Sequence, residues 1–324
     1  VALSLDSSVI VGARYLDEPS GSETPDPGGV YVYRKSADQS WQFDTRETVP
    51  CIPSTQTLEN ISVQVGSDSF GSAVAIDGNT LLVGDPNGHD SFGRTTGAVR
   101  LFNRASSNAE WEEDTTDLFP NPLGLALADR FGASVAIEGS LAVVGVPGQD
   151  FTGGHAWIYQ YVSESWVPYQ QLTSTGPDDQ LGTSVAITWF GGDAYIAVGA
   201  PGARSDQTAG GTVYVYQWDS TTQWATLRWT LTEDGFIGDT SAFGEAVAID
   251  TRSDGTIVVA VGNPWYAPQA YGCVEIHSLF NLSGFYYSYM ESRLVPSLET
   301  LDPWAIEQLG YAGSSVDLDG GRVI

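Results

Sequence analysis

The sequence predicts an all-β fold, a β-propeller of four-stranded antiparallel blades with five full blades and the start of a sixth. Three observations predict it. One short phrase recurs along the chain, each copy is followed by two further strand-like segments, and the first segment of each copy consists largely of small residues. A four-stranded sheet cannot bury both of its faces alone, so such copies stack around an axis. A β-sandwich is the alternative, but it does not repeat one four-strand pattern five times.

The recurring phrase is a hairpin of two short apolar segments. It reads FGSAVAIDGNTLLVGDP from residue 70, FGASVAIEGSLAVVGVP from 131, LGTSVAITWFGGDAYIAVGAP from 181, FGEAVAIDTRSDGTIVVAVGNP from 243 and, in part, AGSSVDLDGGRVI from 312. The glycines in second position, Gly71, Gly132, Gly182, Gly244 and Gly313, are separated by 61, 50, 62 and 69 residues. Residues 2–14 resemble the same unit without its Phe-Gly pair. Repeats of this length predict stacked supersecondary units.

Each copy continues with a third and a fourth strand. The third begins with glycine, as in GGVYVYRK from residue 28, GAVRLFNR from 97, GHAWIYQY from 154, GTVYVYQW from 211 and GCVEIHSL from 272. The fourth opens on Trp41, Trp111, Trp166 or Trp224, with Phe285 as the departure. Alternation and β-branched or aromatic residues favour strands in both segments. We expect each opening tryptophan to cover the wide gap at the rim.

The strand pattern predicts a single domain over residues 1–324. Its expected blades are near 1–60, 66–125, 128–176, 178–237 and 240–306, with a partial blade at 308–324. Small residues such as Gly132, Ala133, Ser134 and Ala136 fit an innermost strand, because strands crowd near the axis of a propeller. Val143 and Val144 are expected to fill the space between blades.

The Phe-Gly pair followed by Val-Gly, one further residue and Pro resembles the FG-GAP repeat. This repeat is found in the β-propeller of integrin α-subunits and in many secreted proteins of bacteria and microbial eukaryotes. The resemblance covers almost the whole chain. It implies a parent propeller of six or seven blades, so that this chain is part of a longer one. Because propellers host many activities, it does not by itself define the function.

The charge balance excludes several partners. The chain has 13 basic and 40 acidic residues, a formal net charge of −27, and Lys35 is its single lysine. Nucleic acid and anionic membranes attract basic patches, so neither is expected as a partner. No apolar run reaches the roughly 18 residues of a membrane helix, which predicts no membrane insertion in this segment. The surface favours cations and basic partners.

Glycosylation sequons and cysteine usage favour an extracellular or cell-surface protein of the secretory pathway. The sequons are Asn60-Ile61-Ser62 and Asn281-Leu282-Ser283, so Asn60 and Asn281 are the predicted glycosylation sites. Cys51 and Cys273 are too few for a disulfide scaffold and form no zinc motif, which leaves buried thiols or a single bridge.

Calcium is the one cofactor that the sequence suggests. The resemblance implies a site in the first hairpin, with the pattern D-x-D/N-x-D-G-x-x-D, but residues 250–255 carry Arg252 at a ligand position and Val258 follows at the last one. The loop between the second and third strands offers Asp85, Asn87 and Asp90 instead, so we expect any calcium there. An acidic solvated loop without a cation is the alternative.

The sequence favours binding over catalysis. His89, His155 and His277 fall in different blades, and no GxSxG, HExxH or phosphate-binding loop is present. We therefore expect an extracellular non-catalytic module that presents loops to a protein or glycan partner, including copies of itself in a cell-surface assembly or in adhesion. The predicted binding residues are loop aromatics, with rim packing as their alternative role: Tyr15, Phe92, Phe151, Trp265, Tyr266 and Tyr271. A secreted propeller enzyme that acts on polysaccharide is the competing hypothesis.

Overall fold

The computed structural model describes the strands and part of the connecting loops. The described residues are 2–3, 8–13, 29–34, 56–58, 69–89, 94–106, 109–114, 122, 129–148, 153–173, 176, 179–205, 208–233, 241–264, 272–282, 284–295, 315–319 and 322–323. Every regular element among them is a strand, and none of these residues forms a helix that is long and apolar enough to cross a membrane. The chain divides into two compact units, residues 1–141 with 160–168 and residues 142–159 with 169–324.

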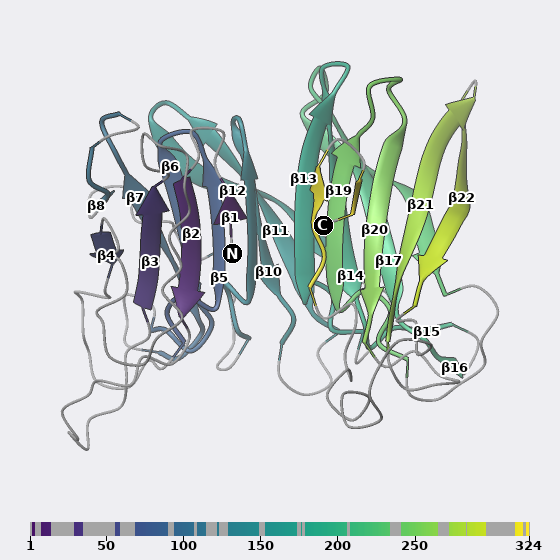
Figure 1. The fold of residues 1–324 in the computed structure, drawn as a ribbon, viewed down its shortest axis with the longest axis horizontal. Coiled ribbons are helices and arrows are strands. Elements are labelled where there is room, and N and C mark those ends of the chain that lie inside the picture. Colours follow the sequence, from purple (N-terminus) through teal and green to yellow (C-terminus); the bar gives the residue numbers. More distant parts are fainter. Residues whose placement is uncertain are drawn as a thin grey trace. The chain divides into compact units, whose positions relative to one another are not determined.

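In the described part of the chain, five antiparallel sheets of four strands follow one another, which confirms the predicted four-strand repeat (Figure 1). The first sheet contains β1 (Ala2–Leu3), β2 (Ser8–Ala13), β3 (Gly29–Arg34) and β4 (Gln56–Leu58). The second contains β5 (Ala73–Asp77), β6 (Thr80–Asp85), β7 (Ala98–Asn103) and β8 (Glu112–Glu113), and the third contains β9 (Ser134–Glu138), β10 (Leu141–Val146), β11 (His155–Val162) and β12 (Ser165–Thr173).

The fourth and fifth sheets have the longest strands. The fourth contains β13 (Ser184–Phe190), β14 (Asp193–Ala200), β17 (Thr212–Asp219) and β18 (Trp224–Thr232), and the fifth contains β19 (Ala246–Thr251), β20 (Ile257–Asn263), β21 (Cys273–Leu282) and β22 (Phe285–Leu294). The described residues also form two separate two-stranded hairpins. One pairs β15 (Arg204–Ser205) with β16 (Thr208–Ala209), and the other pairs β23 (Leu318–Asp319) with β24 (Arg322–Val323). In each four-stranded sheet the strands lie in chain order, so β22 is the last strand of the fifth sheet.

The Phe-Gly pair ties each hairpin to the sheet before it. Phe131 forms a parallel bridge with Gly97, Leu181 with Gly154, and Phe243 with Gly211. These three glycines are the ones that open the third strand of the preceding copy. The bridging Phe or Leu side chain is fully buried in every case. The two most regular features of the sequence are therefore the two halves of one contact between successive sheets.

The glycines in this contact are required for close approach. A Cβ on Gly211, where φ is +77°, would lie 2.1 Å from the carbonyl oxygen of Phe243. A Cβ on Gly199, in the Val-Gly of β14, would lie 2.0 Å from the carbonyl oxygen of Gly244. A side chain at either position would push two sheets apart, because real Cβ atoms do not approach backbone so closely.

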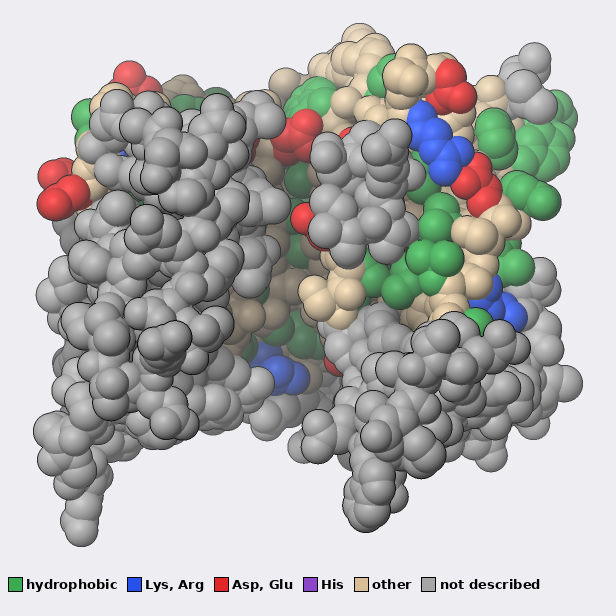
Figure 2. All heavy atoms as spheres, in the orientation of Figure 1, with side chains coloured by type: hydrophobic (Ala, Val, Ile, Leu, Met, Phe, Trp, Pro, Cys, Tyr) green, Lys and Arg blue, Asp and Glu red, His purple; other side chains and the backbone are tan. Residues whose placement is uncertain are grey.

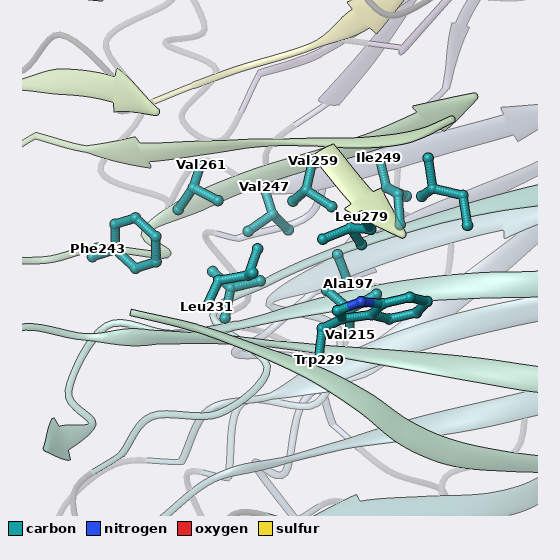
Figure 3. Packing of buried hydrophobic residues seen from close by; sticks show 12 residues of the cluster. Ala197, Val215, Trp229, Leu231, Phe243, Val247, Ile249, Val259, Val261 and Leu279 are labelled. Carbon is teal, nitrogen blue, oxygen red and sulfur yellow. The ribbon is translucent and has the colours of Figure 1, made fainter. Parts of the chain in front are cut away.

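Apolar side chains fill the space between neighbouring sheets within each unit. In the second unit, Ala197, Val213, Val215, Trp229 and Leu231 of the fourth sheet pack against buried residues of the fifth, namely Val247, Ile249, Ile257, Val259, Val261 and Leu279 (Figure 3). In the first unit, Val30 and Val32 of β3 pack with Phe70, Leu81, Val83, Phe102 and Trp111 of the second copy. Val143 and Val144 of β10 are fully buried, as predicted for this strand.

The opening tryptophans do not all cover the rim as expected. Trp111 and Trp166 are buried, whereas 54% of Trp224 is exposed. The buried tryptophan of β18 is Trp229, which stands opposite Val215 at a register shift in the pairing of β17 with β18. The expectation was wrong for Trp224, which opens β18 opposite Asp219 at the turn end of the hairpin. The bulge places Trp229 on the face that packs against the fifth sheet.

Candidate functional site

The predicted loop aromatics lie outside the described residues. These are Tyr15, Phe92, Phe151, Trp265, Tyr266 and Tyr271, and the same holds for the sequon residue Asn60 and for Cys51. Their roles therefore stay predictions. The second sequon is described: Asn281 is an exposed residue near the end of β21, and its Oδ1 accepts a hydrogen bond from the backbone N–H of Gly284 at 3.0 Å. Its exposure is what a glycosylation site requires.

The predicted cation loop begins at a buried carboxylate. Asp85 ends β6 and is fully buried, and its carbonyl oxygen accepts a hydrogen bond from Gly88 N–H at 2.8 Å. Asn87 donates to the hydroxyl of Ser69, just before Phe70. Asp90, the third predicted ligand, falls outside the described ranges. Among the residues that are described, no three His, Cys, Asp or Glu side chains form a metal-binding group, so calcium remains a prediction for this loop.

The first hairpin of the fifth sheet shows turn chemistry at the position that the FG-GAP resemblance assigns to calcium. Asp254 accepts a hydrogen bond from Thr256 N–H at 2.9 Å, and this bond holds the pKa of Asp254 below its usual range. Arg252, which stands at a ligand position, instead donates from Nη1 and Nη2 to the two carboxylate oxygens of Glu291, at 2.5 and 2.6 Å. The hairpin is thus tied to β22 by an ion pair.

Four exposed aromatic side chains lie on one face of the outer half of the fifth sheet, and we call them the aromatic strip. They are Phe280 of β21 and Phe285, Tyr287 and Tyr289 of β22, which are 40%, 66%, 51% and 65% exposed. The residues of β22 alternate along the strand, and Phe280 pairs directly with Tyr287, so all four share a face. Hydrophobic side chains accordingly gather at the surface over β21 and β22 (Figure 2).

The opposite face of β22 is packed against the fourth sheet. Tyr286 makes an edge contact with Trp229, with ring centroids 5.0 Å apart, and the guanidinium of Arg228 lies 4.8 Å from the Tyr286 ring centroid. The indole N–H of Trp229 also donates to the carbonyl oxygen of Tyr287 at 3.0 Å. These contacts hold β22 in place, so the aromatic strip is presented from a fixed strand.

A buried polar cluster lies where β21 faces the fourth sheet. Glu275 is fully buried, and its Oε1 accepts hydrogen bonds from Nε and Nη2 of Arg293 at 2.9 and 2.6 Å. Its Oε2 lies 3.1 Å from Nε2 of His277, whose ring makes an edge contact with Phe243. Burial raises the pKa of the free thiol of Cys273 to about 12, and the negative charge of Glu275 adds to this effect.

This cluster accounts for one of the three histidines that the sequence placed in separate copies. His277 contacts Glu275, whereas His89 lies in the loop after β6, with its Nε2 3.4 Å from Thr95 Oγ1. Sequence reasoning missed the cluster because Glu275 and Arg293 are remote in sequence and meet only through the pairing of β21 with β22. The alternation of Cys273, Glu275 and His277 was the one local signal, since it places three polar groups on one face of a strand.

The repeated sheets and their contacts define an all-β protein built of propeller blades. The FG-GAP repeat family matches residues 62–102 and 125–159, which span the hairpins β5–β6 and β9–β10. These two segments are therefore FG-GAP repeats, as their Phe-Gly and Val-Gly motifs predict. No curated protein matches the sequence.

Two solved structures are similar to the chain. Sucrose-6-phosphate hydrolase from Lactobacillus gasseri is 10% identical, with a TM-score of 0.45, over 81% of this chain and 58% of that one. A hypothetical selenium-binding protein from Sulfolobus tokodaii is 9% identical, with a TM-score of 0.47, over 89% of this chain and 60% of that one. The chain thus spans about three fifths of the length of each of these structures.

Proposed function

We propose that this chain is an extracellular, non-catalytic binding or structural module, a rigid acidic propeller that presents loops and one sheet surface to protein or glycan partners. The observation that carries the proposal is the aromatic strip. Tyr and Phe side chains that stay exposed on a fixed strand supply contact area at little cost in conformational entropy. Integrin-like FG-GAP repeats occur in extracellular and cell-surface proteins, which favours this setting.

The size of the aromatic strip supports a binding role. With about 200 Å² for each aromatic side chain, the exposed fractions of its four residues correspond to about 450 Å² of contact surface. The largest apolar patch of a typical monomer covers roughly 300–600 Å² and is often functional. The net charge of −27 directs the choice of partner toward neutral glycans or basic proteins.

The burial of Glu275 and His277 in the buried polar cluster favours a structural role for both residues. A general acid or base must come within hydrogen-bond reach of its substrate. Glu275 is fully buried and His277 is 5% exposed, and each is engaged by a neighbouring side chain. A charged group of this kind contributes to the contact between two sheets when its partners are in place.

Immobilised neutral and basic ligands test the proposal against the polysaccharide-enzyme alternative. Purified protein is passed over a panel of neutral polysaccharides and basic proteins, and each eluate is assayed for newly released reducing ends. Retention without release of reducing ends is the expected result. Release of reducing ends in proportion to the protein concentration would contradict this proposal and support the polysaccharide-enzyme alternative.

A further inference from the structure

Glu233 directly follows β18, at the end of the fourth sheet, and its carboxyl group lies near Glu275 and Arg293 of the buried polar cluster. Both of its carboxylate oxygens are buried, and neither accepts a hydrogen bond from any described residue. A buried carboxylate without donors is costly, whereas a protonated carboxyl group is neutral and is itself a donor. The surroundings of Glu233 therefore favour its protonated form.

The titratable and charged groups described around Glu233 come from two strands of the fifth sheet. They are Cys273, Glu275 and His277 of β21 and Arg293 of β22. Arg293 donates to Glu275 from two nitrogens, at 2.9 and 2.6 Å, so an ionised Glu233 would add a second negative charge beside a pair that is already formed. Burial is the main cause that raises the pKa of Glu233 above its usual range; the charge of Glu275 adds to it, and Arg293 opposes it in part.

The neutral polar side chains beside Glu233 belong to the contact that joins the fourth and fifth sheets. Ser241 and Asn263 lie near its carboxyl group. The hydroxyl of Ser241 donates to the carbonyl oxygen of Gly210 at 3.1 Å and accepts from Nδ2 of Asn263 at 2.8 Å. The same carbonyl oxygen accepts from Phe243 N–H at 3.2 Å, next to the parallel bridge between the two sheets. The hydroxyl donor beside Glu233 is therefore already used in the contact between the sheets.

We propose that Glu233 makes the contact between the fourth and fifth sheets sensitive to pH: the contact is tight while its carboxyl group carries a proton, and it loosens when the group ionises. Ionised Glu233 attracts the hydroxyl of Ser241 away from the carbonyl oxygen of Gly210, because a carboxylate is the stronger hydrogen-bond acceptor. Its charge also repels that of Glu275. The inference goes beyond the proposed binding function and does not depend on it, since both effects act between two sheets of the second unit.

Urea unfolding of wild type and Glu233→Gln over a range of pH tests the proposal. An unfolded glutamate titrates near about 4.3, and below this pH Glu233 is protonated in both states and resembles glutamine. Above it the unfolded chain loses its proton first. The unfolding equilibrium constant of wild type is then expected to rise relative to that of the variant by up to about tenfold per pH unit, and to level off once folded Glu233 ionises. A ratio that is independent of pH, or that falls as the pH rises, overturns the proposal.

Glu291→Gln is the matched control, because it removes the same charge at a carboxylate that is bonded to Arg252. Its pH dependence is expected to have the opposite sign. The pKa of Glu291 is lowered to about 2, so wild type gains stability over this variant as the pH rises through the acid range. Opposite signs for the two variants support the proposal, and the same sign for both overturns it.

NMR measures the proton on Glu233 directly. Its carboxyl carbon is expected to titrate above the ordinary glutamate value of about 4.3, and closer to that value in Glu275→Gln, which lacks the neighbouring charge. As Glu233 ionises, the backbone amide of Phe243 should lose protection from hydrogen exchange relative to Glu233→Gln at the same pH. Titration at or below the ordinary value overturns the proposal. Equal protection of Phe243 in the two proteins overturns the effect on the contact between the sheets.

Discussion

Gly211 and Phe243 form a parallel bridge in which the α-carbon of the glycine faces the backbone of the phenylalanine. The bridge joins the start of β17 to the residue that introduces the first hairpin of the next sheet. The same relationship recurs between Gly97 and Phe131 and between Gly154 and Leu181. Successive sheets are thus fixed by backbone contact at one end, in addition to the apolar packing between them.

Replacement of Gly211 by alanine is expected to destabilise the protein by about 1–3 kcal/mol or more, because the backbone there has φ of +77° and a Cβ would meet the Phe243 carbonyl. Gly210→Ala is the matched control, since nothing lies within 4 Å of a Cβ at that position and its φ is not positive. Urea unfolding of both variants measures the difference. Equal stabilities would contradict the close approach.

A buried amide joins the outer strands of the third and fourth sheets. Gln170 donates to the carbonyl oxygen of Ala225 at 2.9 Å and accepts from its N–H at 2.8 Å. Gln170→Ala leaves both backbone groups without a partner, at a cost of about 1–3 kcal/mol for each group that stays buried. Gln171→Ala, at the next and exposed position, is expected to change the unfolding free energy by less than about 0.5 kcal/mol. The prediction fails if the two variants unfold at the same urea concentration.

Two arginines of the fifth sheet are expected to differ in how much they contribute to the free energy of unfolding. Arg293→Met removes the partner of the fully buried Glu275 and should cost about 3–5 kcal/mol. Arg252→Met breaks an ion pair whose side chains are 31% and 28% exposed, and should cost about 1 kcal/mol or less. Thermal unfolding of the two variants at neutral pH measures both. A larger loss for Arg252→Met would show that the buried cluster is not a stabilising unit.

Calcium binding, if it occurs, is expected in the loop that follows β6. Titration of calcium into metal-stripped protein should show one site that disappears in the double variant Asp85→Asn and Asp90→Asn, because a hard cation prefers carboxylate oxygens. At a calcium concentration 100 times the dissociation constant, the ion should stabilise the wild type by about 2.7 kcal/mol. Asp254→Asn, in the hairpin after β19, is the control and should retain the site. Binding that survives in the double variant would rule out this loop.

The repeated strands were predictable because their signals are local. Each Phe-Gly pair, glycine-led strand and alternating segment lies within a few residues of the structure it forms, so Phe131 and Gly97 were both recognised although their contact was not. The bridge between them depends on how two sheets stack, which no single repeat encodes. The burial of Trp229 likewise depends on a bulge in the pairing of β17 with β18, which sets the face on which this side chain lies.

The aromatic strip was not predicted, since aromatic residues in a strand are usually core. Tyr286 and Tyr287 are neighbours in sequence, and only the position of the fourth sheet determines that Tyr286 packs on Trp229 while Tyr287 is exposed. The departure of Phe285 from the tryptophan pattern was the visible signal. It marked β22 as an outer strand with a different environment, without saying which face is open.

The ion pair between Arg252 and Glu291 predicts a defined dependence of stability on acid. Hydrogen bonds from Arg252, and then from Ser278, lower the pKa of Glu291 to about 2. An unfolded glutamate titrates near about 4.3, so Glu291 stabilises the folded state above that pH, and its contribution is lost as the pH falls toward 2.

The variant Glu291→Gln isolates this contribution, because glutamine resembles the protonated acid at every pH. The difference in unfolding free energy between wild type and variant should be about 1 kcal/mol or less near neutral pH, as the pair is partly exposed. It should shrink between about pH 4.3 and 2 and vanish below that range. In Arg252→Gln the Glu291 pKa should rise toward its ordinary value, which an NMR titration of its side chain measures. A difference that stays constant from pH 6 to pH 2 would show that Glu291 is not held by these bonds.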